Sequence, residues 1–204
     1  MLLASLTLAS GASAAEPPGN TVLIVGDSLS AEYGIERGTG WVSLLESRLG
    51  DTFPDVRVQN ASISGDTTSG GLTRLPDTLR QHGPSVVMIE LGANDALRGL
   101  SLSATRENLA QMITLSQDYG AAVVLVGMQI PPNYGTRYAR QFSELFPELA
   151  QEHQTGLVPF LLEGIAADKS MFQSDGIHPS EAAQAAIADN VWPVLKSVLE
   201  RRQQ

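Results

Sequence analysis

Five short runs of strand-forming residues, separated by stretches with helical spacing, constrain the fold of this chain most. Most of the runs are continuously apolar and rich in β-branched residues, which is typical of strands buried on both faces of a sheet. The runs cover residues 22–25, 56–58, 86–89, 121–126 and 157–162. Strands that alternate with helices form a parallel sheet covered by those helices. We therefore predict a three-layer α/β/α sandwich with a central five-stranded parallel sheet.

Apolar residues at helical spacing predict the helices that lie between and after these strands. The predicted helices cover residues 41–49, 72–79, 103–119, 138–152 and 180–199. Thr67, Thr68 or Ser69 is available to cap the second helix. Pro147 is expected to interrupt the fourth helix, and Pro193 to kink the last one or break it into two pieces.

The first residues resemble a secretory signal peptide. An apolar stretch is followed by small residues at the positions where a signal peptidase cleaves, although no lysine or arginine precedes the stretch. The stretch is too short to span a bilayer. We therefore predict a signal peptide over residues 1–15, a single domain over residues 16–204, and a periplasmic or secreted mature protein.

Composition excludes several classes of function. The net charge of −9 argues against a nucleic-acid partner and against binding to anionic lipid through charge. The chain has no cysteine, which excludes disulfides and thiolate chemistry, and only three histidines, which argues against a multi-histidine metal centre. We expect a monomer that needs no metal or organic cofactor and has no integral membrane segment after cleavage.

Residues suited to acyl-transfer chemistry follow several of the predicted strands. Binding sites in open parallel sheets form beyond the carboxyl ends of the strands, so residues that are distant in sequence meet at that edge. Gly26, at the end of the first strand, allows a tight turn into the next residues. The candidates that follow the first, second, third and fifth strands are Ser28, Gly65, Asn94, Asp175 and His178.

These residue types match the parts of a serine hydrolase. Ser28 is the candidate nucleophile, and the imidazole of His178 is the candidate base that would take its proton. Asp175 can accept a hydrogen bond from the other ring nitrogen and stabilise the imidazolium. The backbone N–H groups of Ser28 and Gly65 and the side-chain amide of Asn94 can form an oxyanion hole.

Each candidate also has an ordinary structural interpretation. Ser28 alone could cap a helix, Gly65 could serve a tight turn, and Asn94 could be a turn residue. Chance would not place a nucleophile, a base and several hydrogen-bond donors at one edge of the sheet, and we therefore favour catalysis. Three nearby carboxylates are expected to be structural and are given no catalytic role: Asp27, Asp66 and Asp95. Glu90, at the end of a strand, could be buried and paired with another group.

Four sequence blocks, in order, resemble those of the SGNH (GDSL) hydrolase family. They are residues 26–29 (GDSL), 61–67 (ASISGDT), 92–95 (GAND) and 175–179 (DGIHP), and the resemblance covers essentially the whole mature chain. It is nearest to the branch of bacterial periplasmic multifunctional thioesterases, lysophospholipases and arylesterases. The resemblance implies a flavodoxin-like SGNH hydrolase fold, a triad of Ser28, His178 and Asp175, and an oxyanion hole from Ser28, Gly65 and Asn94.

Two positions depart from the pattern of this family. Glu32 stands where similar proteins often have glycine, and Ala93 where many have a second glycine. Neither departure removes a catalytic atom. Glu32 could change the charge at the mouth of the site and therefore the substrate preference.

Apolar residues in the loops after the third and fourth strands suggest a groove for an acyl chain, although they could instead only pack the bases of these loops. They are Leu97, Leu100, Leu102, Met128, Ile130, Pro131, Pro132 and Tyr134. Together with the resemblance, they favour a serine esterase and thioesterase that acts on small-molecule fatty-acyl substrates through an acyl-enzyme. Two alternatives are a carbohydrate deacetylase of the same fold and a noncatalytic module that binds a small ligand.

Overall fold

The computed structural model describes residues 19–203, and the predicted signal peptide lies outside them. Its centre is a five-stranded sheet in the order β2-β1-β3-β4-β5, in which every neighbouring pair is parallel. The strands are β1 (Thr21–Gly26), β2 (Arg57–Asn60), β3 (Val86–Glu90), β4 (Ala122–Val126) and β5 (Gly156–Val158). The predicted five-stranded parallel sheet is confirmed.

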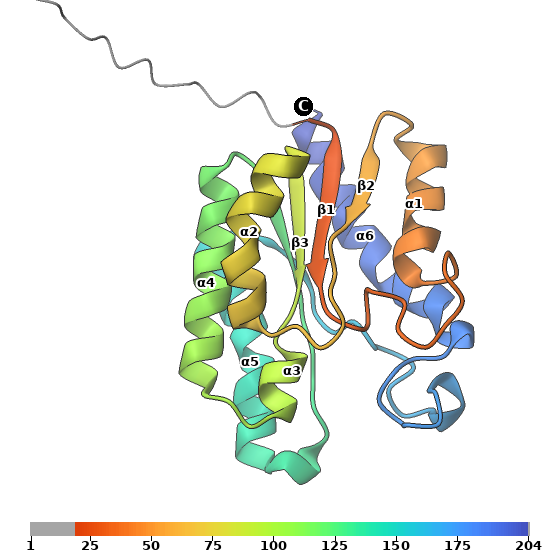
Figure 1. The fold of residues 1–204 in the computed structure, drawn as a ribbon, viewed down its shortest axis with the longest axis vertical. Helices are drawn as coiled ribbons and strands as arrows, with labels where there is room; N and C mark the ends of the chain where they lie inside the picture. Colours follow the sequence, from red (N-terminus) through yellow and green to blue (C-terminus); the bar gives the residue numbers. More distant parts are fainter. Residues whose placement is uncertain (1–18, 204) are drawn as a thin grey trace, which may run out of the picture.

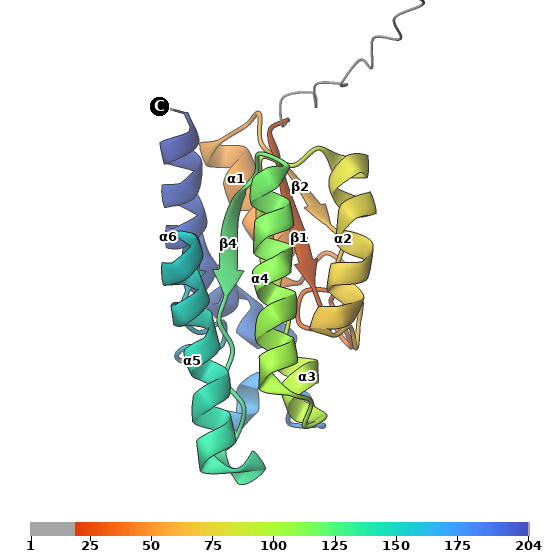
Figure 2. The same cartoon turned by 90° about the vertical axis from the view of Figure 1, so that its left-hand side faces the viewer.

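Helices cover both faces of the sheet (Figures 1 and 2). They are α1 (Trp41–Thr52), α2 (Thr68–His82), α3 (Ala93–Leu97), α4 (Leu102–Asp118), α5 (Thr136–His153) and α6 (Gln184–Arg202). Helices α1 and α6 pack against each other on one face, and α2, α4 and α5 pack side by side on the other. The predicted three layers are therefore confirmed. Within residues 19–203, no helix combines the length and apolarity needed to cross a membrane.

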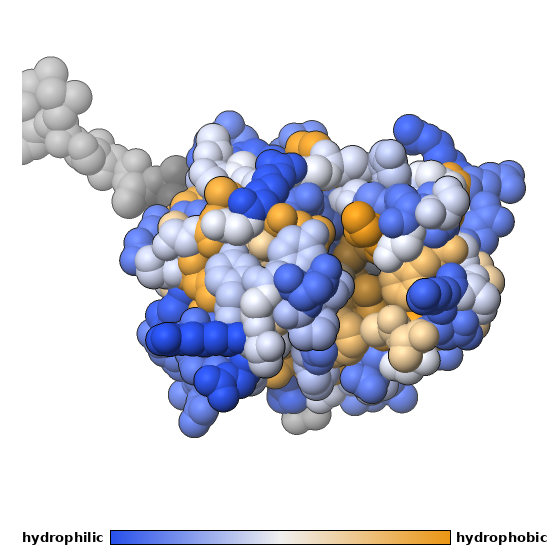
Figure 3. Space-filling model, turned by 90° about the horizontal axis from the view of Figure 1, so that it is seen from below, coloured by the Kyte–Doolittle hydropathy of each residue, from blue (hydrophilic) through white to orange (hydrophobic). Residues whose placement is uncertain are grey.

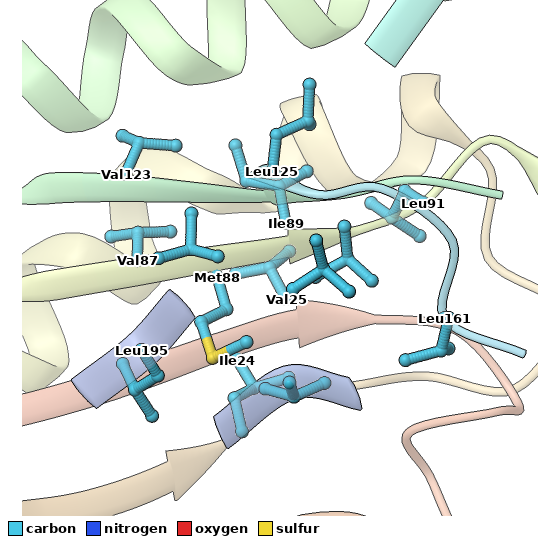
Figure 4. Packing of buried hydrophobic residues seen from close by; sticks show 14 of the residues in the cluster. Ile24, Val25, Val87, Met88, Ile89, Leu91, Val123, Leu125, Leu161 and Leu195 are labelled. Atoms are coloured by element: carbon cyan, nitrogen blue, oxygen red, sulfur yellow. The ribbon is translucent and has the colours of Figure 1, made fainter. Parts of the chain in front are cut away.

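Buried side chains hold the central strands in place. All five residues of β3 are buried, and Ile24 and Val25 of β1 are inaccessible to solvent. Figure 4 shows the side chains of Ile24 and Val25, with residues 87–89 of β3, packed with Leu125 of β4 and with Leu195 of α6. Each buried aliphatic side chain contributes about 1.5–3 kcal/mol to the stability of the fold. Sliding a strand along the sheet would break this packing, so the core fixes where each strand ends. The loops at the carboxyl ends of the strands, at the lower edge in Figure 1, therefore start from rigid positions.

The cap of α2 agrees with the sequence, although the helix begins at Thr68 and not at the predicted residue 72. Thr67 is its cap, and the Thr67 side chain accepts a hydrogen bond from the N–H of Gly70. One helix differs from the prediction, because α5 is not interrupted at Pro147. Helix α6 is not broken into two pieces at Pro193 either, and the kink expected there stays a prediction. An internal proline costs about 3 kcal/mol. In α5 this cost is offset by four large buried side chains on the same helix: Phe142, Leu145, Phe146 and Leu149.

Three boundaries also differ from the prediction. The fifth strand ends at Val158 and not at residue 162, because Pro159 follows and has no N–H to donate to a neighbouring strand. The short helix α3 occupies a stretch that was expected to be a loop. The last helix begins with a 3₁₀ turn (Glu181–Ala183) before α6.

Candidate active site

The turn after β1 places Ser28 at the carboxyl edge of the sheet. Gly26 is required there by close packing, since a Cβ at this position would lie 2.7 Å from Glu90 Oε2 and 2.8 Å from Ser30 Oγ. The Ala31 N–H then donates to the Asp27 carbonyl at 3.0 Å, which closes the turn around Ser28. The strand and the buried side chains beneath it therefore determine the position of the hydroxyl.

Ser28 lies within hydrogen-bond distance of His178, although 150 positions separate them. Ser28 Oγ is 2.9 Å from His178 Nε2, and His178 Nδ1 is 2.7 Å from Asp175 Oδ2. Asp175 Oδ1 accepts hydrogen bonds from the N–H groups of His178 and Ile177, at 3.0 and 2.9 Å. These backbone bonds and the bond from the His178 ring lower the pKa of Asp175 to about 2. The ionised carboxylate accepts Nδ1–H, so the Nε2 lone pair faces the Ser28 hydroxyl.

Two backbone N–H groups at this edge are free to bind a ligand. Among residues 19–203, the N–H groups of Ser28 and Gly65 have no protein acceptor. Gly65 has a φ of +79°, which glycine adopts without strain. Its loop is bonded to the end of β1, because the Ile63 N–H donates to the Gly26 carbonyl at 3.0 Å. Unpaired donors in such a position are suited to an oxyanion.

The amide of Asn94 is held in place by Asp27. Gly92, two residues after the end of β3, has a φ of +119° and precedes α3, and Asn94 lies in the first turn of that helix. Asn94 Nδ2 donates to Asp27 Oδ2 at 2.9 Å. An amide nitrogen carries two hydrogens, so one remains for a ligand.

Two buried carboxyl groups lie beneath the nucleophile turn. Asp27 is 1% exposed and Glu90 2% exposed, and Glu90 Oε2 accepts hydrogen bonds from the Ser30 hydroxyl (2.7 Å) and the Asp27 N–H (3.2 Å). Burial raises the pKa of Asp27 to about 6. Burial, and then the charge of Asp27, raise the pKa of Glu90 well above its usual range. The sequence suggested a structural role for Asp27, but not its bond to Asn94.

The other two carboxylates brace loops, as predicted. Asp95 accepts hydrogen bonds from the N–H (2.9 Å) and the hydroxyl (2.5 Å) of Thr68, at the start of α2. Asp66 pairs with Arg74, whose Nε lies 2.9 Å from Asp66 Oδ2. Both carboxylates therefore fix α2 relative to the loops at the site.

Glu32 braces the loop that precedes α1. It has a φ of +57°, the left-handed conformation that favours glycine. Its carboxylate accepts hydrogen bonds from the N–H groups of Gly38 and Gly40 and from the Ser43 hydroxyl. Burial alone would raise the pKa of Glu32, but these hydrogen bonds lower it below its usual range. The sequence singled out this position but did not predict the bracing role.

The apolar residues proposed for an acyl groove divide into exposed and buried groups. Leu100 and Tyr134 are 43% and 44% exposed, whereas Met128 and Ile130 belong to the buried core. Met128 and Ile130 therefore pack the base of their loop, which is the alternative that the sequence left open. Figure 3, which views this edge, shows apolar surface around a hollow.

The remaining residues of this set lie around the exposed ones. Pro131 and Pro132 are exposed, in the loop after β4. Leu97 and Leu102 end α3 and begin α4, so they belong to helices and not to the predicted loop. Both are partly buried against the core.

The other two histidines are far from Ser28. His82 and His153 are the last residues of α2 and α5, which end next to the starts of β3 and β5 at the opposite edge of the sheet. In the described part of the chain, no group of three histidine, aspartate or glutamate side chains could hold a metal ion.

Comparisons with known proteins agree with this geometry. The family model described as the GDSL-like Lipase/Acylhydrolase family matches residues 24–186. Esterase TesA of Pseudomonas aeruginosa is 51% identical over 179 residues, which cover 88% of this chain and 89% of that protein. Thioesterase 1/protease 1/lysophospholipase L1 of Escherichia coli is 42% identical over 170 residues, with 83% and 80% covered. A crystal structure of TesA matches with a TM-score of 0.85 at 50% identity, covering 87% of this chain and 99% of that one.

Proposed function

This chain belongs to the GDSL-like lipase/acylhydrolase family, and we propose that it hydrolyses fatty-acyl esters and thioesters through an acyl-enzyme on Ser28. One observation carries the proposal: hydrogen bonds of 2.7 and 2.9 Å connect Asp175, His178 and Ser28 in a continuous line at the sheet edge. The names of the similar proteins, an esterase and a thioesterase, support the same class of reaction.

In this mechanism His178 acts as the general base. As Ser28 Oγ attacks the acyl carbon, its proton moves to His178 Nε2, and the electron pair of the carbonyl double bond moves onto the carbonyl oxygen. The ionised Asp175 stabilises the imidazolium. When the intermediate collapses, Nε2 gives the proton to the departing alcohol or thiol. A water molecule then attacks the acyl carbon and gives a proton to His178 Nε2. That proton passes to Ser28 Oγ as the bond between Oγ and the acyl carbon breaks, and the fatty acid leaves.

The oxyanion of each tetrahedral intermediate would be bound by three donors. These are the N–H groups of Ser28 and Gly65 and the remaining amide hydrogen of Asn94. The removal of one such donor typically lowers kcat by about 10²–10³-fold. An Asn94→Ala variant is therefore expected to bind substrate but to turn it over slowly.

The exposed apolar side chains favour a fatty-acyl group over an acetyl group. Leu100 and Tyr134 are about half exposed on the loops at this edge, and the adjacent Pro131 is also exposed. A carbohydrate deacetylase would need an open polar groove instead. The similar proteins named above are esterases and thioesterases, which also favours the acyl-chain interpretation.

Labelling with a fluorophosphonate tests the nucleophile and the base. We expect one label per chain on Ser28 and none on Ser28→Ala. His178→Ala should abolish hydrolysis of a p-nitrophenyl ester while its circular dichroism stays unchanged. His82→Ala and His153→Ala are matched controls that should remain active. A folded wild-type protein that takes no label would point to the noncatalytic binding module.

A series of esters tests the substrate class. Rates for p-nitrophenyl esters from acetyl to palmitoyl should rise beyond the acetyl ester, and an acyl-CoA thioester should also be cleaved. An acetylated sugar in the same series should react slowly. Activity confined to the acetyl ester and the acetylated sugar would contradict the fatty-acyl proposal.

We further propose that residues 1–15 form a cleaved signal peptide and that the mature protein is a periplasmic or secreted monomer. N-terminal sequencing of protein recovered from the periplasm or medium should begin near residue 16, and gel filtration should give the mass of one chain. An uncleaved protein found only in the cytoplasm would contradict export.

A further inference from the structure

The loops that carry Ser28 and His178 follow β1 and β5, which are not neighbours in the sheet. Strands β3 and β4 lie between β1 and β5 in the sheet. The long connection from β5 to α6 must therefore reach back along the sheet edge to place His178 on Ser28. Contacts beyond the sheet have to hold this connection in position.

Gln173 joins the two loops through its side-chain amide. Its Nε2 donates to the Tyr33 carbonyl at 2.8 Å and to the Pro179 carbonyl at 3.1 Å. Because both partners are carbonyl oxygens, the nitrogen must face them, and both of its hydrogens are used. The Gln173 N–H also donates to the His178 carbonyl at 2.8 Å. The same residue is thus bonded to the loop of the nucleophile and to the carbonyl groups of both His178 and Pro179.

Gly34 makes room for this amide. Its φ is +72°, and a Cβ at this position would overlap Gln173 Oε1. The chain next to Tyr33 is therefore shaped to let Gln173 approach the backbone closely.

Tyr33 completes the connection between the nucleophile and the base. Its N–H donates to the Ser28 carbonyl at 3.3 Å. Its ring lies against the His178 ring, with 4.4 Å between the centroids and 41° between the planes. Together with the hydrogen bond between Ser28 and His178, these contacts form a closed ring. The ring links Ser28, Tyr33, Gln173 and His178.

We propose that Gln173 is a positioning residue, whose amide holds the loop of His178 against the loop of Ser28 and so sets the distance between Nε2 and Oγ. The proposal rests on the proposed function, since it concerns the same site. Gln173 acts through His178 and does not touch the reacting atoms. Such geometry matters because a misplacement of about 1 Å can lower a rate about a hundredfold.

Gln173→Glu tests the amide with little change of shape. Its carboxylate oxygen would face the carbonyls of Tyr33 and Pro179 and repel both. We expect kcat to fall about 10–100-fold while KM changes less than about threefold, because the chemical step suffers and substrate binding does not. The rate of fluorophosphonate labelling of Ser28 should fall in parallel. Gln173→Ala, which adds no charge, should change the same quantities in the same direction.

Gln184→Ala is the matched control. Gln184 Oε1 accepts a hydrogen bond from the Trp41 N–H at 3.0 Å, and its Nε2 donates to the Ser180 carbonyl at 3.1 Å. Its amide therefore also bridges distant segments, but it touches neither Ser28 nor His178. We expect this variant to lose thermal stability while kcat per titrated active site stays within about twofold of wild type.

The outcomes separate the two proposals. Wild-type kcat and labelling rate in both Gln173 variants would overturn the positioning role. A loss of thermal stability like that of Gln184→Ala with kcat unchanged, or failure of both variants to fold, would also overturn it, since Gln173 would then be only structural. A wild-type protein that neither hydrolyses esters nor takes the label would contradict the proposed function instead.

Discussion

At the scale of single residues, Asp27 holds the Asn94 amide by a hydrogen bond, but its carboxyl group is buried, which disfavours ionisation. Its carboxylate accepts hydrogen bonds from the Leu29 N–H at 3.0 Å and from the Asn94 amide at 2.9 Å. The residue is nevertheless buried next to Glu90, and burial raises its pKa to about 6. The ionised carboxylate of Asp27 holds the Asn94 amide best, but its ionisation near neutral pH lowers the free energy of unfolding.

Asp27→Asn should stabilise the fold in a pH-dependent way. The folded carboxyl keeps its proton up to about pH 6, whereas an unfolded one ionises near 3.8. The folded state binds more protons between these values, so wild-type stability falls as the pH rises through them. The variant has no such proton to lose. Urea unfolding should therefore find the variant more stable than wild type by about 2–3 kcal/mol at pH 8, and close to wild type at pH 4.

Asp27→Asn should also hydrolyse esters about tenfold more slowly than wild type, because a neutral side chain holds the Asn94 amide less strongly than a carboxylate does. Asp95→Asn is the control, since Asp95 is equally buried but bonds to Thr68 and not to the site. It should lose stability at pH 8. A difference between Asp27→Asn and wild type that is the same at both pH values would contradict this account.

The candidate residues could be found from the sequence because each occupies a position with a local signature. Ser28, Gly65 and Asn94 lie shortly after the ends of strands, and Asp175 is three positions from His178 on one loop. The bond from Asn94 to Asp27 and the bond from Gln173 to Tyr33 could not be found in this way. They join residues 67 and 140 positions apart and depend on loop conformations that no hydrophobic period encodes.

At the scale of elements, the sheet was predictable because its three central strands, β1, β3 and β4, are almost fully buried and rich in β-branched residues. The errors occur where tertiary packing outweighs a local signal. Pro147 is a strong helix breaker in isolation, yet α5 continues through it because the surrounding side chains are buried in the core. The short helix α3 was missed because five residues carry too little periodicity to be recognised.

Glu32 gives a prediction at this scale, because it stabilises the start of α1 from outside the helix. Gly40, the residue just before α1, has no side chain to cap the helix, and Glu32 accepts a hydrogen bond from the Gly40 N–H at 2.8 Å. Both Glu32→Gly and Glu32→Ala lose this carboxylate, which should cost about 1 kcal/mol. Glycine should regain about 1 kcal/mol, because Glu32 itself bears the strain of a φ of +57°, which glycine relieves and alanine keeps.

Chemical denaturation of both Glu32 variants checks this prediction. The free energy of unfolding of the glycine variant should stay close to that of wild type, and that of the alanine variant should be about 1 kcal/mol lower. An alanine variant at least as stable as the glycine variant would show that the left-handed conformation is not what constrains this position.

At the scale of the whole molecule, exposed apolar side chains gather at the edge that carries Ser28. Seven large apolar side chains are exposed among residues 19–203, and five of them lie on the loops after the strands, one for each strand. Single exposed apolar residues are ordinary on protein surfaces, but five around one edge are what the proposed binding of a fatty-acyl chain requires. Figure 3 shows this edge. The five are Tyr33, Ile63, Leu100, Tyr134 and Ile177.

Leu100→Ser and Tyr134→Ser should therefore change which acyl chains are preferred. Each methylene group that loses its apolar contact costs about 0.8 kcal/mol, or about fourfold in kcat/KM. The ratio of kcat/KM for a decanoyl ester to that for a butyryl ester should fall several-fold, while hydrolysis of the acetyl ester stays near wild type. Leu44→Ser and Leu115→Ser are matched controls, because they remove similar exposed side chains from α1 and α4. If the ratio fell equally in the controls, or in none of the four variants, the acyl chain would have to bind elsewhere.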